Sequence, residues 1–144
     1  MDKNQIRLLD NSEIENIAAW IGSLKRPGFS WSEGEWRKSA YDFKVYGLPG
    51  SCFILFQELA DSVEILALGT HPDRQRQALM RNVLLNFYSF LDSKFTEIWL
   101  EVHAENLPAR LLYESLGFQQ VGERPHYYGP GETAILMTKR LPRE

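Results

Sequence analysis

The sequence predicts a mixed α/β fold, built as a sandwich around one sheet. Apolar residues recur with a period of two in some segments and with helical spacing in others, and these segments follow one another in the order β-α-α-β-β-β-α-β-α-β-β. The chain has 144 residues, 44% of them hydrophobic and 24% charged, which suits one globular domain. We therefore expect a single domain over residues 1–144.

The first third of the chain predicts one short strand and two helices. A strand at 6–9 precedes a capping box at Ser12–Glu15, which opens a helix. A second capping box at Ser32–Glu35 opens a short helix that ends near Ala40. Between the two helices, residues 25–31 form a loop rich in glycine, proline and aromatic residues. The buried stripe expected for the first helix comprises Ile14, Ile17, Ala18 and Ile21.

The middle of the chain predicts a hairpin followed by a central strand. Apolar and polar residues alternate from Asp42, a turn follows at 48–50, and an apolar run occupies 52–56. Residues 63–70 are apolar at nearly every position, as in a strand that is covered on both faces.

The last half predicts two helices and three strands. A long helix is expected from about Gln75 to Asp92, with an inner stripe at Leu79, Val83, Phe87 and Leu91. A strand at 96–103 follows, and then a helix that Asn106 caps and Gly117 ends. Final strands at 118–123 and 133–139 flank a loop rich in tyrosine, glycine and proline.

The composition excludes several classes of protein. Sixteen basic and 19 acidic residues give a net charge of −3, whereas nucleic-acid binders are typically basic. No stretch approaches the roughly 20 apolar residues of a membrane span, and the first residues lack the apolar segment of a signal peptide. The single cysteine, Cys52, excludes an internal disulfide and is typical of a core residue. We expect a cytoplasmic monomer or weak homodimer with no nucleic-acid or membrane partner.

Two local patterns carry possible chemistry, and each has a structural alternative. Arg74, Arg76 and Arg81 surround the start of the long helix, where backbone N–H groups and the helix dipole favour a phosphate, although such arginines can equally be solvated surface. Glu101 and Tyr113 could serve as a base and a weak acid near one cleft, or as a strand-edge charge and a half-buried helix residue.

The histidines add little to these patterns. His103 shares a strand face with Glu101 and could assist proton movement, although a lone histidine is more often structural. The spacing of His71, His103 and His126 is not that of a metal site, so no metal is expected.

Taken together, these features resemble the GNAT superfamily of acyl-CoA-dependent N-acetyltransferases, and most closely its RimI-type branch, the ribosomal-protein-alanine N-acetyltransferases. The resemblance covers nearly the whole chain and is most specific in TEIWLEVHAENLPARLLYESLGFQQVG, residues 96–122. FSWSE, residues 29–33, is similar to the loop by which that branch receives its substrate peptide. HPDRQRQALMR, residues 71–81, lies where the family has its pyrophosphate loop. The resemblance implies a GNAT fold, with a mixed central sheet flanked by helices on both faces.

The resemblance also implies an acetyl-CoA-dependent reaction and roles for particular residues. Glu101 would be the general base, acting directly or through water, and Tyr113 the general acid for the departing thiolate. Asn106 would contact the cofactor or the catalytic water. The backbone of Leu68, Gly69 and Thr70 would bind the pantetheine and polarise the thioester. The pyrophosphate would be held by Arg76, Gln77, Ala78, Leu79, Met80 and Arg81. The acceptor would be contacted by Trp31, Glu33, His103, Tyr127 and Tyr128.

The pyrophosphate loop departs from the family pattern at two positions. Ala78 adds a methyl group where the family has glycine, and Met80 is bulkier than the usual glycine or alanine, so we expect its side chain to widen the apolar stripe of the helix. The expected acceptor is a protein N-terminus. Two alternatives stay open: an acetyltransferase for a small amine such as a polyamine, an amino sugar or an amino acid, and a catalytically silent acyl-CoA-binding module.

Overall fold

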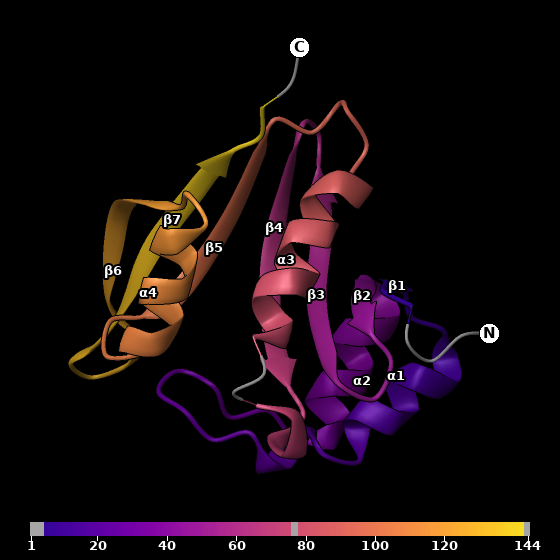
Figure 1. The fold of residues 1–144 in the computed structure, drawn as a ribbon. Helices are drawn as coiled ribbons and strands as arrows, with labels where there is room; N and C mark the ends of the chain where they lie inside the picture. Colours follow the sequence, from indigo (N-terminus) through magenta and orange to yellow (C-terminus); the bar gives the residue numbers. More distant parts are fainter. Residues whose placement is uncertain (1–4, 76–77, 143–144) are drawn as a thin grey trace. The chain divides into compact units, whose positions relative to one another are not determined.

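A computed structural model describes residues 5–75 and 78–142, and the order of its elements is the predicted one (Figure 1). The helices are α1 (Asn11–Ala18), α2 (Glu33–Asp42), α3 (Leu79–Phe90) and α4 (Leu107–Ser115), with short 3-10 turns η1 (Ile21–Ser23) and η2 (Pro72–Arg74). The strands are β1 (Arg7–Leu8), β2 (Lys44–Leu48), β3 (Cys52–Leu59), β4 (Ser62–Thr70), β5 (Glu97–His103), β6 (Gln119–Gly129) and β7 (Glu132–Arg140). None of the helices within these described residues is long and apolar enough to cross a membrane.

The strands form a mixed sheet in the order β1-β2-β3-β4-β5-β7-β6. β1 and β2 pair antiparallel, as do β2 and β3, whereas β4 and β5 pair parallel. On the far side of β5, the chain returns to antiparallel pairing with β7 and β6. The α/β fold class predicted from the sequence is therefore confirmed.

The described residues fall into two compact units. The first unit takes its residues from 1–25, 30–57 and 66–91, and the second from 26–29, 58–65 and 92–144. β4 therefore begins in the second unit and ends in the first. The single domain expected over the whole chain stays a prediction, and each unit is described by itself below.

In the first unit, helices cover both faces of the sheet. Phe53 and Phe56 lie three residues apart on β3, so their side chains point to opposite faces. Trp36 of α2 packs against Phe53 with ring centroids 4.7 Å apart, and Phe87 of α3 packs against Phe56 at 4.9 Å. The Trp36 indole also donates a hydrogen bond of 2.9 Å to the Ile14 carbonyl, which joins α2 to α1. All four aromatic side chains are fully buried.

In the second unit, β5 is the central strand. It pairs parallel with the first part of β4, and along its whole length it pairs antiparallel with β7, from Glu97 opposite Arg140 to His103 opposite Ala134. Figure 1 draws α4 in front of the strands of this unit. Tyr113 of α4 is buried, as are Leu116 and Phe118 just after the helix, and the rings of Tyr113 and Phe118 lie 5.7 Å apart.

The structure corrects three predicted boundaries. The capping box of α1 is formed by Asp10 and Glu13, whereas Ser12 donates a hydrogen bond to Asp10. α3 begins at Leu79 and not near Gln75, because residues 72–74 form the separate turn η2. β6 continues through an irregularity to Gly129, so Tyr127 and Tyr128 belong to a strand and not to a loop. The capping box of Ser32 and Glu35 is confirmed.

Candidate active site

The candidate residues fall in both units. In the first unit, the end of β4 brings Leu68, Gly69 and Thr70 to the carboxyl end of the strand. Gly69 is packed so closely that a Cβ there would lie 2.7 Å from Leu24 Cδ1 and 2.9 Å from Phe53 Cε1. The main chain at Gly69 therefore lies closer to these two side chains than any other residue type would allow.

The chain that follows β4 is held back against β3. The His71 N–H donates a 2.7 Å hydrogen bond to the Ser51 carbonyl, and Cys52 Sγ lies 3.4 Å from Thr70 Oγ1. Cys52 is buried, and burial raises the pKa of its thiol. A thiol in these surroundings stays protonated at neutral pH, as expected for a core residue and not for a nucleophile.

The start of α3 lies in the same unit, and Ala78, the residue before it, is exposed. Ala78 is the residue before the helix, has a φ of 55° in the left-handed region, and caps no backbone N–H with its side chain. The N-cap residue therefore offers no side-chain acceptor to the first N–H groups of α3, and such groups at a helix start suit an anion. Met80 is buried, as the sequence predicts, whereas Arg74 and Arg81 are exposed. Arg76 and Gln77 lie outside the described residues.

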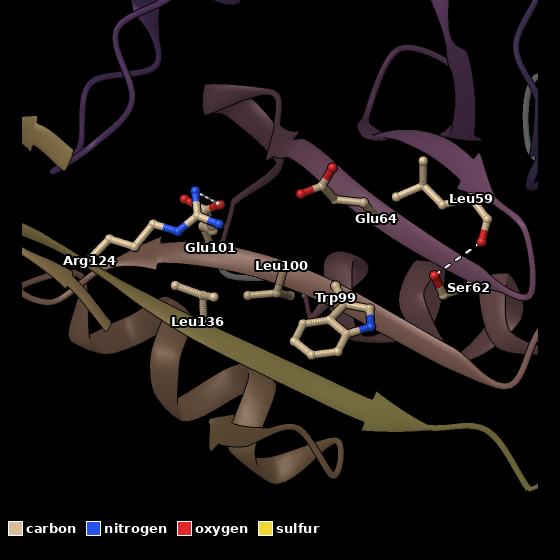
Figure 2. Close-up of a pocket in the computed structure, with 8 residues that line it drawn as sticks. All are labelled: Leu59, Ser62, Glu64, Trp99, Leu100, Glu101, Arg124 and Leu136. Carbon is tan, nitrogen blue, oxygen red and sulfur yellow. Dashed lines mark hydrogen bonds and ion pairs between the residues drawn. The ribbon is translucent and has the colours of Figure 1, made fainter. Parts of the chain in front are cut away.

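In the second unit, Glu101 lies on β5 with a side chain that is 18% exposed. Its Oε1 is 3.5 Å from Arg124 Nη1 of β6, an ion pair that Figure 2 shows. Its Oε2 is buried and has no hydrogen-bond partner among the described residues. A buried carboxylate oxygen is stabilised by a hydrogen-bond donor, so Oε2 is able to accept a hydrogen bond from another group.

Two tyrosines of β6 surround Glu101. The charge of the Glu101 carboxylate is the main reason why the pKa of Tyr127 is raised. Burial, and after it the charge of Glu101, raises the pKa of Tyr128 to about 12. Their rings meet edge to face at 5.0 Å. Both phenols therefore stay protonated at neutral pH and present hydrogen-bond donors near a carboxylate.

His103 supports Tyr128 from the end of β5. The two rings stack with centroids 5.2 Å apart, and His103 is 3% exposed. Its Nδ1 accepts a 3.0 Å hydrogen bond from the Glu105 N–H, so the ring proton is on Nε2. Nε2 lies 3.2 Å from Glu132 Oε2, outside hydrogen-bond geometry.

His103, Glu105 and Glu132 together place three possible metal ligands within 4.8 Å of one another. Nδ1 of His103 already accepts the hydrogen bond from the Glu105 N–H, so Nε2 is the ring atom left for another partner.

Tyr113 lies on α4 and is 5% exposed. Burial raises the pKa of its phenol to about 12, although the nearby charge of Arg26 acts in the opposite direction. Arg26 belongs to the 26–29 segment of the same unit, and its guanidinium lies 4.2 Å from the centroid of the Phe29 ring. Tyr128 also acts electrostatically on Tyr113. Tyr128 is thus a shared neighbour of Glu101 and Tyr113.

The remaining candidates have local roles that the structure makes visible. The Asn106 side chain caps α4 by accepting a hydrogen bond from the Ala109 N–H at 3.4 Å. In the first unit, the ring of Trp31 lies 6.4 Å from that of Trp36, and Glu33 forms an ion pair of 3.3 Å with Arg37 on α2. The second unit thus gathers Glu101, His103, Tyr127 and Tyr128, whereas Trp31 and Glu33 belong to the first unit.

Sequence reasoning missed Arg124 and Arg26. The period-two pattern predicts a strand that ends at Glu123, so no sequence signal places Arg124 beside Glu101. Arg26 lies in the loop whose glycine, proline and aromatic content marks it as unusual, but nothing local points from that loop to Tyr113.

Comparison with known proteins identifies relatives over nearly the whole chain. A model described as "Acetyltransferase (GNAT) family" matches residues 50–118. A curated [ribosomal protein bS18]-alanine N-acetyltransferase from Salmonella typhimurium is 31% identical over 143 residues, which cover 93% of this chain and 95% of the relative. The enzyme of that name from Escherichia coli K12 is 37% identical over 145 residues, with the same coverage.

Solved structures give the same result. The crystal structure of the ribosomal-protein-S18-alanine N-acetyltransferase from Escherichia coli aligns with a TM-score of 0.84 and 28% identity, over 98% of this chain and 96% of that one. Ard1 from Thermoplasma volcanium aligns with a TM-score of 0.79 over 96% of this chain and 98% of its own, and at 20% identity it supports the fold alone. The predicted GNAT fold is confirmed.

Proposed function

The chain belongs to the GNAT family of acetyltransferases, and from this premise we propose that it acetylates the N-terminal α-amine of a protein, such as a ribosomal protein. Acetyl-CoA is the acyl donor of this family and therefore of this chain. The observation that carries the proposed acceptor is the match over 93% of the chain to curated enzymes named for a ribosomal-protein alanine.

Glu101 is the proposed base. An α-amine with a pKa of about 7.7–8.0 must lose a proton at a cost of about 1 kcal/mol at pH 7, whereas a lysine at about 10.4 costs roughly 4.6 kcal/mol. A single carboxylate, acting directly or through one water, is adequate for the first task. The buried Oε2 of Glu101 is an acceptor without a partner among the described residues, which suits a group that receives a proton from the amine.

The donor-binding residues are proposed in the first unit. Leu68, Gly69 and Thr70 form the carboxyl end of β4, and their backbone groups are the proposed partners of the pantetheine. The uncapped N–H groups at the start of α3 suit the pyrophosphate, since a helix N-terminus binds anions through these donors and its dipole. Acetyl-CoA supplies an activated acetyl thioester, and backbone donors near Gly69 would stabilise the negative charge that develops on its oxygen.

Tyr113 is proposed as the group that faces the departing sulfur. With a pKa of about 12, it is about 3.5 units weaker as an acid than a thiol of pKa near 8.5. Complete proton transfer would therefore cost about 5 kcal/mol, whereas a hydrogen bond from the phenol needs no transfer. We infer that Tyr113 stabilises the thiolate mainly as a hydrogen-bond donor.

Direct transfer to the amine is proposed, without an acyl-enzyme. The chain has one cysteine, and Cys52 is buried with a raised pKa. The amine nitrogen forms the new bond to the acetyl carbon, the carbon–sulfur bond breaks, and the amine proton passes to Glu101.

The acceptor class is tested by mass spectrometry of intact products. The protein is incubated with acetyl-CoA and a panel of peptides that begin with alanine, serine, methionine or a blocked residue, together with spermidine and free amino acids. We expect a single acetyl group only on peptides with a free N-terminal alanine or serine. Acetylation confined to the small amines would replace the proposed acceptor. Binding of acetyl-CoA in calorimetry with no product on any acceptor would identify a silent acyl-CoA-binding module.

A further inference from the structure

Two apolar side chains, Leu24 and Phe53, close one side of the end of β4. A Cβ on Gly69 would lie 2.7 Å from Leu24 Cδ1, 2.9 Å from Phe53 Cε1 and 3.2 Å from Phe53 Cζ. Leu24 is 4% exposed, and Phe53 is fully buried. All three residues belong to the first unit. Leu24 and Phe53 therefore form an apolar wall against the main chain of Gly69, in the strand segment proposed to bind the donor.

Phe53 is the fixed part of this wall. Its ring centroid lies 4.7 Å from that of Trp36 on α2 and 5.9 Å from that of Trp20. Rings packed on two sides hold Phe53 in place. Leu24 directly follows η1, where its N–H donates a 3.2 Å hydrogen bond to the Ile21 carbonyl. Its side chain ends against Gly69, so the size of residue 24 determines how far the wall reaches.

The wall and α3 lie on opposite faces of the sheet. Phe53 points to the face that Trp36 covers, whereas Phe56 points to the face that α3 covers with Phe87. The pyrophosphate is proposed at the start of α3, so the pantetheine arm reaches the end of β4 from the α3 face. The sulfur and the acyl chain are on opposite sides of the planar thioester carbonyl. With the sulfur toward α3, the acyl chain points toward the wall.

We propose that Leu24, supported by Phe53, limits the transferred acyl group to the two carbons of acetyl. The inference rests on the proposed function, because it takes the thioester to lie at the backbone of Leu68 to Thr70. The acetyl methyl group ends at the wall, and a further methylene would have to displace the buried Leu24 from a closely packed position. Leu24 is therefore a specificity-determining residue for the donor.

The test compares acetyl-CoA, propionyl-CoA and butyryl-CoA as donors. Calorimetry measures the Kd of each donor, and kcat/KM is measured with a peptide that begins with alanine. The variants are Leu24→Val, Leu24→Ala and the volume-conserving Leu24→Met. The matched controls are Leu84→Val and Leu84→Ala, because Leu84 is a fully buried leucine of the same unit that lies on α3. These controls create a similar cavity on the other face of the sheet.

We expect the wild-type kcat/KM to be about 20-fold lower for propionyl-CoA than for acetyl-CoA, within the usual range for one extra methylene in an apolar pocket. Butyryl-CoA should be used less well still. Leu24→Val removes one carbon, so it should bring propionyl-CoA to within about threefold of acetyl-CoA and still exclude butyryl-CoA. Leu24→Ala should accept both longer donors. Leu24→Met and the two Leu84 variants should keep the wild-type preference.

The preference between donors is the informative quantity, because a general loss of packing would lower all three values of kcat/KM together. A wild-type chain that uses propionyl-CoA as well as acetyl-CoA would overturn the assignment. So would a preference for acetyl-CoA that persists in Leu24→Ala, or one that the Leu84 variants lose equally. Melting temperatures verify that each variant is folded, and Leu24→Val tests the wall with the smaller cavity if Leu24→Ala unfolds.

The two measurements separate this inference from the proposed function. If acetyl-CoA binds but no peptide is acetylated, the proposed acceptor fails, and the Kd values of the three donors still decide the role of Leu24. If peptides are acetylated but Leu24→Ala leaves the donor preference unchanged, the proposed function stands and the wall is not at Leu24. If none of the three donors binds to the wild-type chain, the proposed donor site fails and this inference fails with it.

Discussion

The backbone of Gly28 lies against His103 so closely that a Cβ at position 28 would be 2.9 Å from His103 Cβ. The same atom would lie 3.2 Å from Cζ of Tyr128, and Gly28 has a φ of +78°. Because His103 stacks on Tyr128, these contacts connect the 26–29 segment to the tyrosine that neighbours Glu101. Glycine at this position is therefore required both by the space and by the backbone conformation.

Gly28→Ala should lower the free energy of unfolding by about 1–3 kcal/mol, since it adds a left-handed strain to an overlap with two side chains. It should also raise the KM for acceptor peptides, because Tyr128 must shift. Urea unfolding and steady-state kinetics measure the two effects. Gly22→Ala is the control, because a Cβ there meets nothing within 4 Å. Equal effects of the two substitutions would contradict the packing of Gly28.

Ala78→Gly should stabilise the chain and improve donor binding. Ala78 has a φ of 55°, where glycine is free of the Cβ clash, so the substitution should add about 0.5–1 kcal/mol to the free energy of unfolding. Removing the methyl group also lets a phosphate approach the start of α3, which should lower the KM for acetyl-CoA a few-fold.

Ala60→Gly is the matched control for Ala78→Gly. Ala60 has a φ of 48° in the turn between β3 and β4, so it should gain similar stability from glycine with no change in the KM for acetyl-CoA. Thermal unfolding and donor titration compare the two variants. If Ala60→Gly lowers the KM for acetyl-CoA, or if Ala78→Gly leaves it unchanged, residue 78 does not contribute to donor binding.

The order and type of the elements could be predicted because each long segment keeps its own apolar period. The first and last residues of the elements could not be predicted, because contacts outside each segment determine them. The sequence predicts a capping box that begins at Ser12, but Arg7 forms two hydrogen bonds of 2.7 Å with Glu13, the residue that closes the capping box of Asp10. The sequence does not predict the extension of β6 to Gly129, because Pro125 and His126, which has a φ of 62°, interrupt the alternation of the strand.

The candidate site was predictable only where its residues lie on regular elements. Glu101 stands out on β5 as a polar residue in an apolar strand, and Tyr113 lies on the helix that Asn106 begins. Arg124 and Arg26 approach these residues through the folding of β6 and of the 26–29 segment, and no local spacing in the sequence encodes that approach.

Asp10→Ala should lower the free energy of unfolding by about 1 kcal/mol, the usual cost of losing an N-cap. The Asp10 carboxylate accepts a 2.9 Å hydrogen bond from the Glu13 N–H, so its removal leaves that donor without its cap. Ser12→Ala should cost less, because the Ser12 hydroxyl only donates to Asp10. Urea unfolding at neutral pH measures both. A larger loss in the free energy of unfolding for Ser12→Ala than for Asp10→Ala would indicate that Ser12, and not Asp10, is the N-cap of α1.

Glu101→Gln should lower kcat about 100-fold at pH 7, within the usual range for loss of a general base. The deficit should shrink toward pH 9, because an α-amine of pKa 7.7–8.0 is then largely neutral without help. The pH profile of kcat with an alanine peptide measures the effect. Glu114→Gln is the control, since Glu114 is an exposed residue of α4. If Glu101→Gln keeps full activity from pH 7 to pH 9, Glu101 is not the base that accepts the proton of the amine.

Tyr113→Phe should reduce the loss in the free energy of unfolding that occurs between pH 8 and pH 11. The folded-state pKa of Tyr113 is about 12, whereas an unfolded tyrosine titrates near 10, so the unfolded chain loses the proton first. The stability that the raised pKa represents is fully present below pH 10 and is lost as the pH rises toward 12, by about 1.4 kcal/mol at pH 11. Urea unfolding at pH 8 and pH 11 measures this loss. At pH 8 the Tyr113 phenol is protonated in both the folded and the unfolded state, so the value at pH 8 is the reference for each protein. The wild-type chain should lose about 1.4 kcal/mol more than Tyr113→Phe between these values. Equal losses would show that the phenol of Tyr113 titrates normally.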